Sequence, residues 1–321
     1  MNGRERVERA LRFSGPDRIP VSLPPPYPND ILECWPDRPP LDTSKGPTRD
    51  EWGSLWASVS PGAIGEVVEP AIIEWDRCPH FRIPPVNDPE PYARSARAVA
   101  EDRGERYAVG VLPVSLFARA HHIRGLNNVL ADFYLNPDRL AGLVDTMVAL
   151  AVESVERYHA MGAHGVMMYD DWGLQGRLMI HPALWRQFYK ERYARVWSRA
   201  HELGMTNWLH SCGKISDILE DMIEAGLDVV QMDQQVNMGV ESLGQRFGGR
   251  LTFWCPVDIQ MVMPTNDAAA IEGYVQRLIR AFGSRGGGFI GKWYPSPQAA
   301  GHSQEMIRLM CESFLKYGRY D

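Results

Sequence analysis

Three residues whose side chains bind transition metals stand at the ends of apolar stretches. His210 and Cys212 lie two residues apart where one such stretch meets a polar one, and Cys255 ends a second stretch. Residues two apart on extended backbone point to the same side, so the first pair is able to hold one ion. Imidazole nitrogen and thiolate sulfur suit Zn²⁺, and three protein ligands with an open fourth position are typical of catalytic zinc sites. We therefore predict that His210, Cys212 and Cys255 bind zinc.

A pair of acids, Asp170 and Asp171, follows another apolar stretch. Either carboxylate is suited to orienting a substrate or moving a proton, so both are candidate catalytic residues. Adjacent residues on a strand point to opposite faces, so we expect only one of the two to enter a shared site. The alternative is that one carboxylate caps the next helix and the other forms a salt bridge.

Six further residues are candidates for contact with a substrate, because they lie at or near predicted strand ends. The first belongs to a segment rich in basic and imidazole side chains, 119–125, which either binds an anionic group or forms a solvated loop. The last precedes the final predicted helix, where it either acts as an acid or base or caps the surface. The candidates are Arg119, Trp172, Gln175, Asp233, Asp258 and His302.

Strands and helices alternate regularly from about residue 88 onward. Apolar stretches bounded by turn residues predict strands, and apolar residues at helical spacing predict the helices between them. This alternation is typical of parallel βαβ units and predicts an α/β protein with a (β/α)₈ TIM-type barrel. We treat residues 1–321 as one domain whose main barrel is 88–321. The predicted strands span 107–112, 165–169, 206–209, 228–232, 251–254 and 287–290, and the predicted helices span 88–104, 136–162, 182–203, 215–223, 240–247, 266–282 and 303–317.

The first part of the chain, up to about residue 87, is irregular. A helix over 2–13 and a strand over 19–23 precede a long stretch rich in Pro and Trp. Large aromatic side chains need burial, so we expect this N-terminal elaboration to fold over one end of the barrel. The tryptophans concerned are Trp52, Trp56 and Trp75.

The active sites of such barrels lie at the carboxyl ends of the strands, where the metal-binding and catalytic candidates are predicted to meet. Lys292 and Tyr294 are predicted at the same end, without an assigned role. His and Cys at strand ends also serve packing and hydrogen bonding, and one His-x-Cys motif is a weak signal for a metal. The position of Cys255 at the same end strengthens the metal prediction.

Composition and charge narrow the kinds of partner. A formal net charge of −6 and a pI of about 5.9 argue against nucleic acid or an anionic membrane, because both are bound through clustered Lys and Arg. Five Cys in a long chain do not indicate a disulfide framework, and no apolar run reaches the roughly 18 residues that cross a membrane. The N-terminus lacks the apolar core of a signal peptide, so we expect a cytoplasmic protein with a small-molecule partner.

Several segments together match the pattern of a known family. They are Arg4-Glu5-Arg6-Val7, Pro16-Asp17-Arg18-Ile19-Pro20-Val21, Ile123-Arg124-Gly125-Leu126-Asn127-Asn128-Val129-Leu130, Asp170-Asp171-Trp172-Gly173, His181-Pro182 through Phe188-Tyr189, and His210-Ser211-Cys212-Gly213. With these segments the chain resembles the uroporphyrinogen decarboxylase superfamily over nearly its full length. The resemblance implies a TIM-type barrel, in agreement with the alternation of strands and helices.

The two branches of this superfamily differ in substrate anchor and metal site. True uroporphyrinogen decarboxylases carry an Arg-Gln-Ala-Gly-Arg-like segment that binds substrate carboxylates, whereas the equivalent residues 21–27 contain neither Arg nor Gln. Corrinoid-linked methyltransferases hold zinc with His-x-Cys and a distant Cys, so the resemblance is closer to this branch. In the methylcobamide:coenzyme M enzymes the distant Cys lies in the last strand-to-helix loop. Here that loop, 294–302, has no Cys, and Cys255 lies one strand earlier.

The resemblance therefore implies a zinc-dependent methyltransferase that moves a methyl group between a small-molecule donor and a corrinoid (cobalamin) protein or a thiol. The fourth zinc position would be open to substrate or to Asp171 or Asp233. One alternative is a metal-free lyase that decarboxylates a porphyrin or smaller carboxylate, with Asp170 or Asp171 stabilising a protonated intermediate. Another is a non-enzymatic module that binds a corrinoid or other small ligand. The chain would act as a monomer or a homo-oligomer under any of these.

Overall fold

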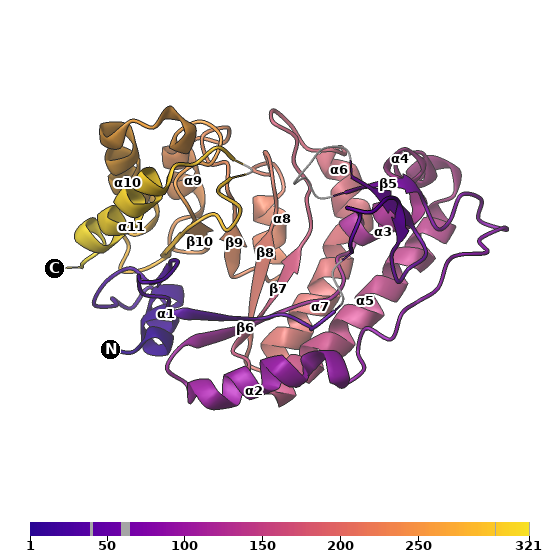
Figure 1. Cartoon of the computed structure of the whole chain (residues 1–321), viewed down its shortest axis with the longest axis horizontal. Helices are drawn as coiled ribbons and strands as arrows, with labels where there is room; N and C mark the ends of the chain where they lie inside the picture. Colours follow the sequence, from indigo (N-terminus) through magenta and orange to yellow (C-terminus); the bar gives the residue numbers. More distant parts are fainter. Residues whose placement is uncertain (39–40, 59–64, 299, 321) are drawn as a thin grey trace.

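Eight parallel strands form a nearly closed barrel in the computed structural model, which describes residues 1–38, 41–58, 65–298 and 300–320 (Figure 1). The strands follow the order β1-β11-β10-β9-β8-β7-β6-β2. The predicted (β/α)₈ barrel is confirmed. Its strands are β1 (Val21–Ser22), β2 (Ile31–Cys34), β6 (Tyr107–Val111), β7 (Gly165–Tyr169), β8 (Thr206–His210), β9 (Val229–Gln231), β10 (Thr252–Cys255) and β11 (Phe289–Lys292).

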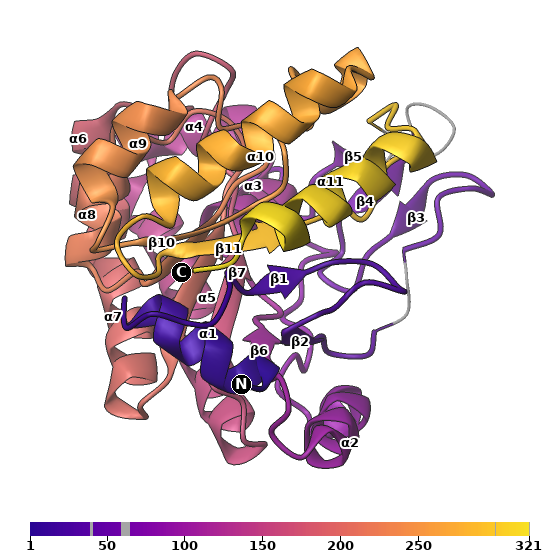
Figure 2. The same ribbon diagram turned by 90° about the vertical axis from the view of Figure 1, so that its left-hand side faces the viewer.

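Helices lie around the outside of this sheet, with α10 and α11 side by side in both views (Figures 1 and 2). The segment 182–203, predicted as one helix, contains a π-helical turn, Arg186–Lys190, between α6 and α7. None of the described helices is long and apolar enough to cross a membrane. The helices are α1 (Gly3–Leu11), α2 (Ala93–Asp102), α3 (Phe117–Arg124), α4 (Leu126–Leu135), α5 (Pro137–Ala160), α6 (Pro182–Trp185), α7 (Glu191–Glu202), α8 (Leu219–Glu224), α9 (Val240–Phe247), α10 (Ala268–Phe282) and α11 (Gln304–Tyr317), with 3₁₀ turns at Glu90–Tyr92 and Met263–Thr265.

Side chains alternate between two buried layers along each strand, because successive strand residues point to opposite faces. One layer fills the barrel interior and includes Met167, Trp208 and Trp254. The other packs between the sheet and the helices and includes Leu209 and Phe253. The last residue of a strand therefore faces the barrel mouth only when it shares the parity of the interior layer. Such residues are Val111, Tyr169, His210, Gln231 and Lys292.

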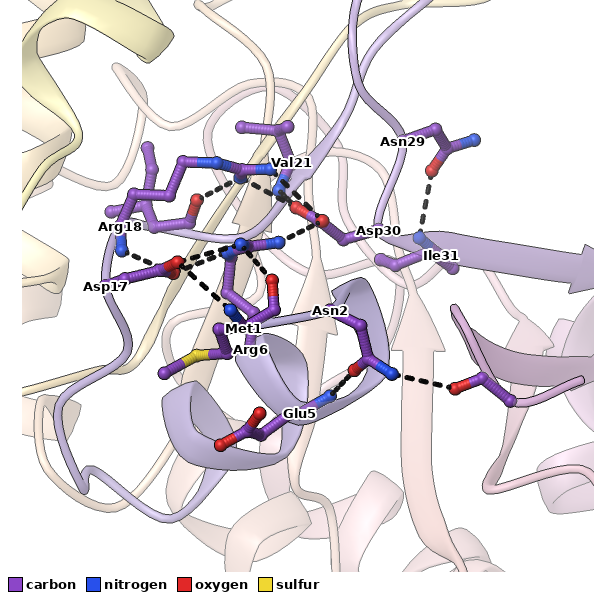
Figure 3. A network of polar contacts seen from close by, with 12 residues as sticks. Met1, Asn2, Glu5, Arg6, Asp17, Arg18, Val21, Asn29, Asp30 and Ile31 are labelled. Atoms are coloured by element: carbon purple, nitrogen blue, oxygen red, sulfur yellow. Dashed lines mark hydrogen bonds and ion pairs between the residues drawn. The ribbon is translucent and has the colours of Figure 1, made fainter.

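The seam between β1 and β2, the two edges of the sheet, is joined through Asp30 (Figure 3). The Asp30 N–H donates to the Val21 carbonyl at 2.7 Å, and its carboxylate accepts the Val21 N–H at 2.8 Å. Arg6 and Arg18 each place a guanidinium nitrogen 2.7 Å from this carboxylate, and Arg6 also pairs with Asp17 at 2.6 Å. The family-like N-terminal segments thus close the barrel at the amino ends of its strands.

The N-terminal elaboration is more ordered than the sequence indicated, and residues 39–40 and 59–64 of it lie outside the described part. It supplies β2, a barrel strand that the sequence analysis did not identify, and a small antiparallel sheet of β3 (Thr48–Arg49), β4 (Leu55–Ala57) and β5 (Glu66–Glu69). As expected, Trp52 and Trp56 are buried. Trp75 is half-buried, and its ring centroid lies 5.0 Å from Cζ of the Arg124 guanidinium.

The segment 119–125 is a helix, not a solvated loop, because it forms most of α3. Three residues of α3 are completely buried and pack in the main core. The elaboration contacts this helix through Ser54, whose hydroxyl donates to the His122 carbonyl at 2.8 Å, and through Asp50, which lies 3.6 Å from Arg119. The contact brings the elaboration to the carboxyl end of the barrel. The three completely buried residues of α3 are Phe117, Ala120 and Ile123.

Candidate active site

A cavity of about 550 Å³ opens at the carboxyl ends of the barrel strands. Its walls come from most strands of the barrel and from the loops that follow them, which is where barrel enzymes carry their chemistry. The polar and aromatic groups on its wall are Trp35, Ser115, Arg119, His122, Tyr169, Asp171, His210, Cys212, Gln231, Asp233, Lys292, Tyr294 and Ser296.

Three of these residues form a compact cluster. Ligand atoms of Asp171, His210 and Cys212 all lie within 4.8 Å of one another, the only such group of three among the described residues. The Nε2 atom of His210 is 3.4 Å from Cys212 Sγ and 3.4 Å from Asp171 Oδ1. An imidazole, a thiol and a carboxylate are the donor types of a catalytic zinc site with three protein ligands.

A second set of contacts fixes the orientation of the His210 ring. Its Nδ1 atom contacts the side-chain oxygen of Gln231, and the Gln231 amide donates to Asp233 Oδ1 at 2.7 Å. Because Gln231 presents an acceptor oxygen, Nδ1 of His210 must carry the proton of the neutral ring. Its Nε2 is then free to bind a metal, as in metal sites whose histidine is held through the opposite nitrogen.

The electrostatics of the cluster favour a positive charge between its members. Burial lowers the pKa of His210, but the hydrogen bonds with Asp171 and Cys212 and the negative charge of Asp233 outweigh it, so the pKa lies well above its usual value. Burial raises the pKa of Asp171, and the contact with His210 reverses this to a net lowering. A proton on His210 meets this demand in the metal-free protein, and a cation held by the three residues would displace it. The residues therefore fit a zinc ion.

Two glycines allow the loops that carry the cluster to approach each other. Gly173 follows the acidic pair and donates its N–H to the Cys212 carbonyl at 3.1 Å. A Cβ on Gly173 or on Gly213 would overlap the backbone of the other loop, and Gly213 also has a positive φ of 72°. Both positions require glycine. The same loop pair lets Asp171 Oδ1 accept the Cys212 N–H at 2.8 Å.

The two adjacent acids have separate tasks, since only Asp171 reaches the cavity. Asp170 is completely buried and accepts the N–H groups of three consecutive residues at the start of α3, at 3.0, 2.9 and 2.7 Å, and the Tyr193 hydroxyl at 2.5 Å. Burial raises its pKa to about 6 against these donors. Asp170 therefore positions α3 and does not face a substrate. The three donors are Leu116, Phe117 and Ala118.

Cys255 does not join the cluster of Asp171, His210 and Cys212. It is completely buried and belongs, with Phe253, to the layer between sheet and helices, whereas Trp254 points into the barrel. Burial raises the pKa of its thiol far above the usual value, and Gln235 of the neighbouring loop contacts it. The arrangement thus gives no support to Cys255 as third ligand and brings Asp171 to that place instead.

Four of the six proposed substrate contacts lie outside the cavity wall. Trp172 is completely buried and stacks on Phe117 with ring centroids 4.3 Å apart. The Asp258 carboxylate accepts hydrogen bonds from three backbone N–H groups, two in its own loop and one in a neighbouring loop, at 2.8 to 3.0 Å. The others are Gln175, which donates to Gln260 at 2.8 Å, and the buried His302, which contacts the Ile259 carbonyl at 3.0 Å.

The remaining two, Arg119 and Asp233, do line the cavity. The Arg119 guanidinium lies at its edge, 3.6 Å from Asp50 and 5.2 Å from the centroid of the Trp52 ring. Asp233 lies beside the cluster and acts on it through Gln231.

Sequence reasoning missed four residues of the barrel mouth. Tyr169 and Gln231 end their strands with the parity of His210, which only the structure shows. Glu33 lies on β2, the strand that was not identified, and Trp35 directly follows it. The Trp35 ring packs against Tyr169 at 5.2 Å, and both side chains hydrogen-bond Glu33.

Comparison with known proteins identifies the family. The sequence model for uroporphyrinogen decarboxylase (URO-D) matches residues 60–291. The chain belongs to the uroporphyrinogen decarboxylase family. The match covers the strands β6 to β10 and β11 up to residue 291, and so includes the whole Asp171, His210 and Cys212 cluster.

Solved structures share the fold of this uroporphyrinogen decarboxylase family member. A methyltransferase from Methanosarcina mazei superposes with a TM-score of 0.71 at 13% sequence identity, over 99% of each chain. D-psicose 3-epimerase from Clostridium cellulolyticum H10 aligns over 72% of this chain and 86% of its own, with 10% identity and a TM-score of 0.45. No curated protein sequence matches the chain. At this identity the similarity to the M. mazei structure establishes the barrel fold alone.

Proposed function

We propose that this uroporphyrinogen decarboxylase family member is a zinc-dependent methyltransferase that transfers a methyl group from a small-molecule donor to a corrinoid protein or a thiol. The observation that carries the proposal is the convergence of Asp171, His210 and Cys212 on the wall of the barrel-mouth cavity. The fold shared with the M. mazei methyltransferase over nearly the full length of both chains supports the reaction class.

Asp171, His210 and Cys212 would hold the metal and leave its fourth position open to the cavity. Zinc bound there supplies a Lewis acid that favours the deprotonated form of a thiol or hydroxyl. Gln231 accepts the Nδ1 proton of His210, so Nε2 is the nitrogen that a metal would bind in place of a proton, and Asp171 orients the Cys212 backbone by accepting its N–H. The side chains thus hold the ligand atoms in place before a substrate arrives.

Metal analysis tests the first half of the proposal. Protein purified without chelator is expected to contain one zinc per chain, and Asp171→Ala, His210→Ala and Cys212→Ala are expected to lose it. Gln175→Ala is a matched control, because Gln175 follows the same strand as Asp171 but contacts Gln260 outside the cavity. Wild-type protein without stoichiometric zinc would contradict the proposal.

An assay of methylcobalamin formation tests the second half. The zinc-loaded protein is mixed with cob(I)alamin and a panel of methylated alcohols, thiols, amines and ethers, and the visible spectrum is followed. We expect turnover with at least one donor and none with His210→Ala. Decarboxylation that does not depend on zinc would support the lyase alternative, and ligand binding without any turnover would support a binding module.

A further inference from the structure

Lys292 is a buried cation on the wall of the barrel-mouth cavity. It ends β11 with the parity of the barrel interior, and it is only 8% exposed. In the order of the barrel, β11 and β7 are separated by β10, β9 and β8 on one side and by β1, β2 and β6 on the other. Lys292 therefore lies on the opposite wall from the strand that leads to Asp171.

The contacts of Lys292 leave its charge without an anionic partner. Its Nζ atom donates to the Trp293 carbonyl at 3.2 Å and lies 5.6 Å from the centroid of the Trp254 ring. Within the described ranges no carboxylate oxygen comes within 4.0 Å of it, as the ion pairs show. An ammonium group has three N–H donors, and burying its charge without a counterion is costly. A lysine with a purely structural role would be expected to have an acidic partner here.

The other long cation on the cavity wall shows the contrast. Arg119 already lies 3.6 Å from Asp50 and over the Trp52 ring. Its charge is therefore directed to the elaboration and not to a ligand. Of these two cations, Lys292 is the one available to an anion in the cavity.

Glu33 is an acid whose pKa is influenced by the charge of Lys292, but the two side chains do not form a direct ion pair. Burial raises the pKa of Glu33, and the opposing effects of Lys292, Trp35 and Tyr169 do not restore the usual value. Among the described residues the Glu33 carboxylate does not come within 4.0 Å of Lys292 Nζ, so Glu33 does not compensate the ammonium charge by a direct ion pair.

We propose that Lys292 binds the acid group of the substrate, which is a small organic anion that carries the methyl group to be transferred. The statement that this anion carries a methyl group for transfer rests on the proposed function, whereas the binding of an acid group by Lys292 does not. One cation on one wall matches one acid group, and the cluster on the far wall then faces the rest of the molecule. The absence of Arg and Gln from residues 21–27 agrees with a substrate that has few acid groups.

Calorimetric titration of the zinc-loaded protein tests the proposal with pairs of acids and their neutral amides. The probes are methoxyacetate with methoxyacetamide, methylthioacetate with methylthioacetamide, and 4-methoxybenzoate with 4-methoxybenzamide. We expect at least one acid to bind about 10- to 100-fold more tightly than its amide, the usual range for a hydrogen bond to a charged group. No acid binding more tightly than its amide would overturn the proposal without any variant being needed.

Variants of the lysine locate the effect. Lys292→Gln is expected to bind the acid as weakly as the amide while keeping stoichiometric zinc, and Lys292→Arg is expected to retain the preference for the acid. Lys316→Gln is the matched control, because Lys316 is an exposed residue of α11 that pairs with Glu272. A preference for the acid that survives in folded, zinc-containing Lys292→Gln would also overturn the proposal.

A further variant separates this proposal from the proposed function. His210→Ala is expected to lose zinc and turnover yet still prefer the acid over the amide. Loss of methyl transfer with an intact preference for the acid would contradict only the proposed function, whereas an intact transfer activity without this preference would contradict only the role of Lys292.

Discussion

Nδ1 of His210 is hydrogen-bonded to the side-chain oxygen of Gln231, and the opposite ring nitrogen faces the barrel-mouth cavity. This pair explains why the histidine of the cluster has one usable tautomer. Gln231 itself donates to Asp233 at 2.7 Å, so this chain of side chains fixes the ring with Nε2 directed at Asp171 and Cys212.

Removal of the Gln231 acceptor is expected to weaken zinc binding. Gln231→Met keeps the size of the side chain but leaves His210 Nδ1 without its partner, and we expect a loss of about 10- to 100-fold in zinc affinity. Competition with a chromophoric chelator measures this. Gln245→Met, at an exposed position of α9, should leave the affinity unchanged. Wild-type affinity in Gln231→Met would show that the ring is oriented by other contacts.

The two cysteines near the mouth are expected to respond differently to substitution. Cys212→Ser should lose most of the bound zinc, because Sγ of Cys212 lies 3.4 Å from His210 Nε2. Cys255→Ser should keep its zinc, because Cys255 faces the helices. Metal analysis of both proteins decides the matter. Zinc loss in folded Cys255→Ser would restore Cys255 as a ligand.

The adjacent acids allow a similar comparison. Asp170→Asn should keep zinc but lower the free energy of unfolding by about 2 kcal/mol, because an amide nitrogen would face N–H groups that now reach a carboxylate. Urea unfolding well above the pKa of about 6 measures this for the charged carboxylate. Asp171→Asn should instead lose zinc affinity with little change in stability. The reverse pattern would mean that the roles of the two acids are exchanged.

The barrel seam depends on Arg6 (Figure 3). Arg6→Met is expected to lower the free energy of unfolding by about 3 kcal/mol, the low end for loss of one partner of a buried ion pair, because Arg18 still contacts Asp30. Arg4→Met, which removes an exposed pair with Glu8, should change it by less than about 1 kcal/mol. Urea denaturation compares the two. Equal effects would argue against the seam as a point of stability.

Asp17 gives this seam a pH dependence. The hydrogen bond from Arg6 lowers the pKa of Asp17 below its ordinary value of 3.8. The folded state therefore binds a proton at Asp17 less readily than the unfolded state. The contribution of Asp17 to stability is complete at a pH above its ordinary pKa, and it is lost as the pH falls through its lower pKa in the folded state. Asp17→Asn should reduce the slope of stability against pH below about pH 4. The effect should be modest because the side chain is 46% exposed, and an unchanged slope would assign it to other acids.

The sequence by itself determined the repeating architecture and the centre of the site. Apolar periodicity is a local property, so it located the main strands and helices closely, for example residues 165–169 as β7. The two-residue spacing of His210 and Cys212 is also local, and both residues do reach one cluster. The short strand β2 was missed because its Pro-rich surroundings obscure the apolar pattern.

Only the tertiary structure decided which neighbours complete the site. A shift of one residue in the parity of a strand turns its side chains from the barrel interior to the helices, and the sequence does not fix that parity. The parity of their strands turns the Cys255 side chain towards the helices and the Lys292 side chain towards the barrel interior, although both residues end their strands. Asp170 and Asp171 were likewise separated by contacts with α3 and with β8, which lie far along the chain and are brought together only when the barrel closes.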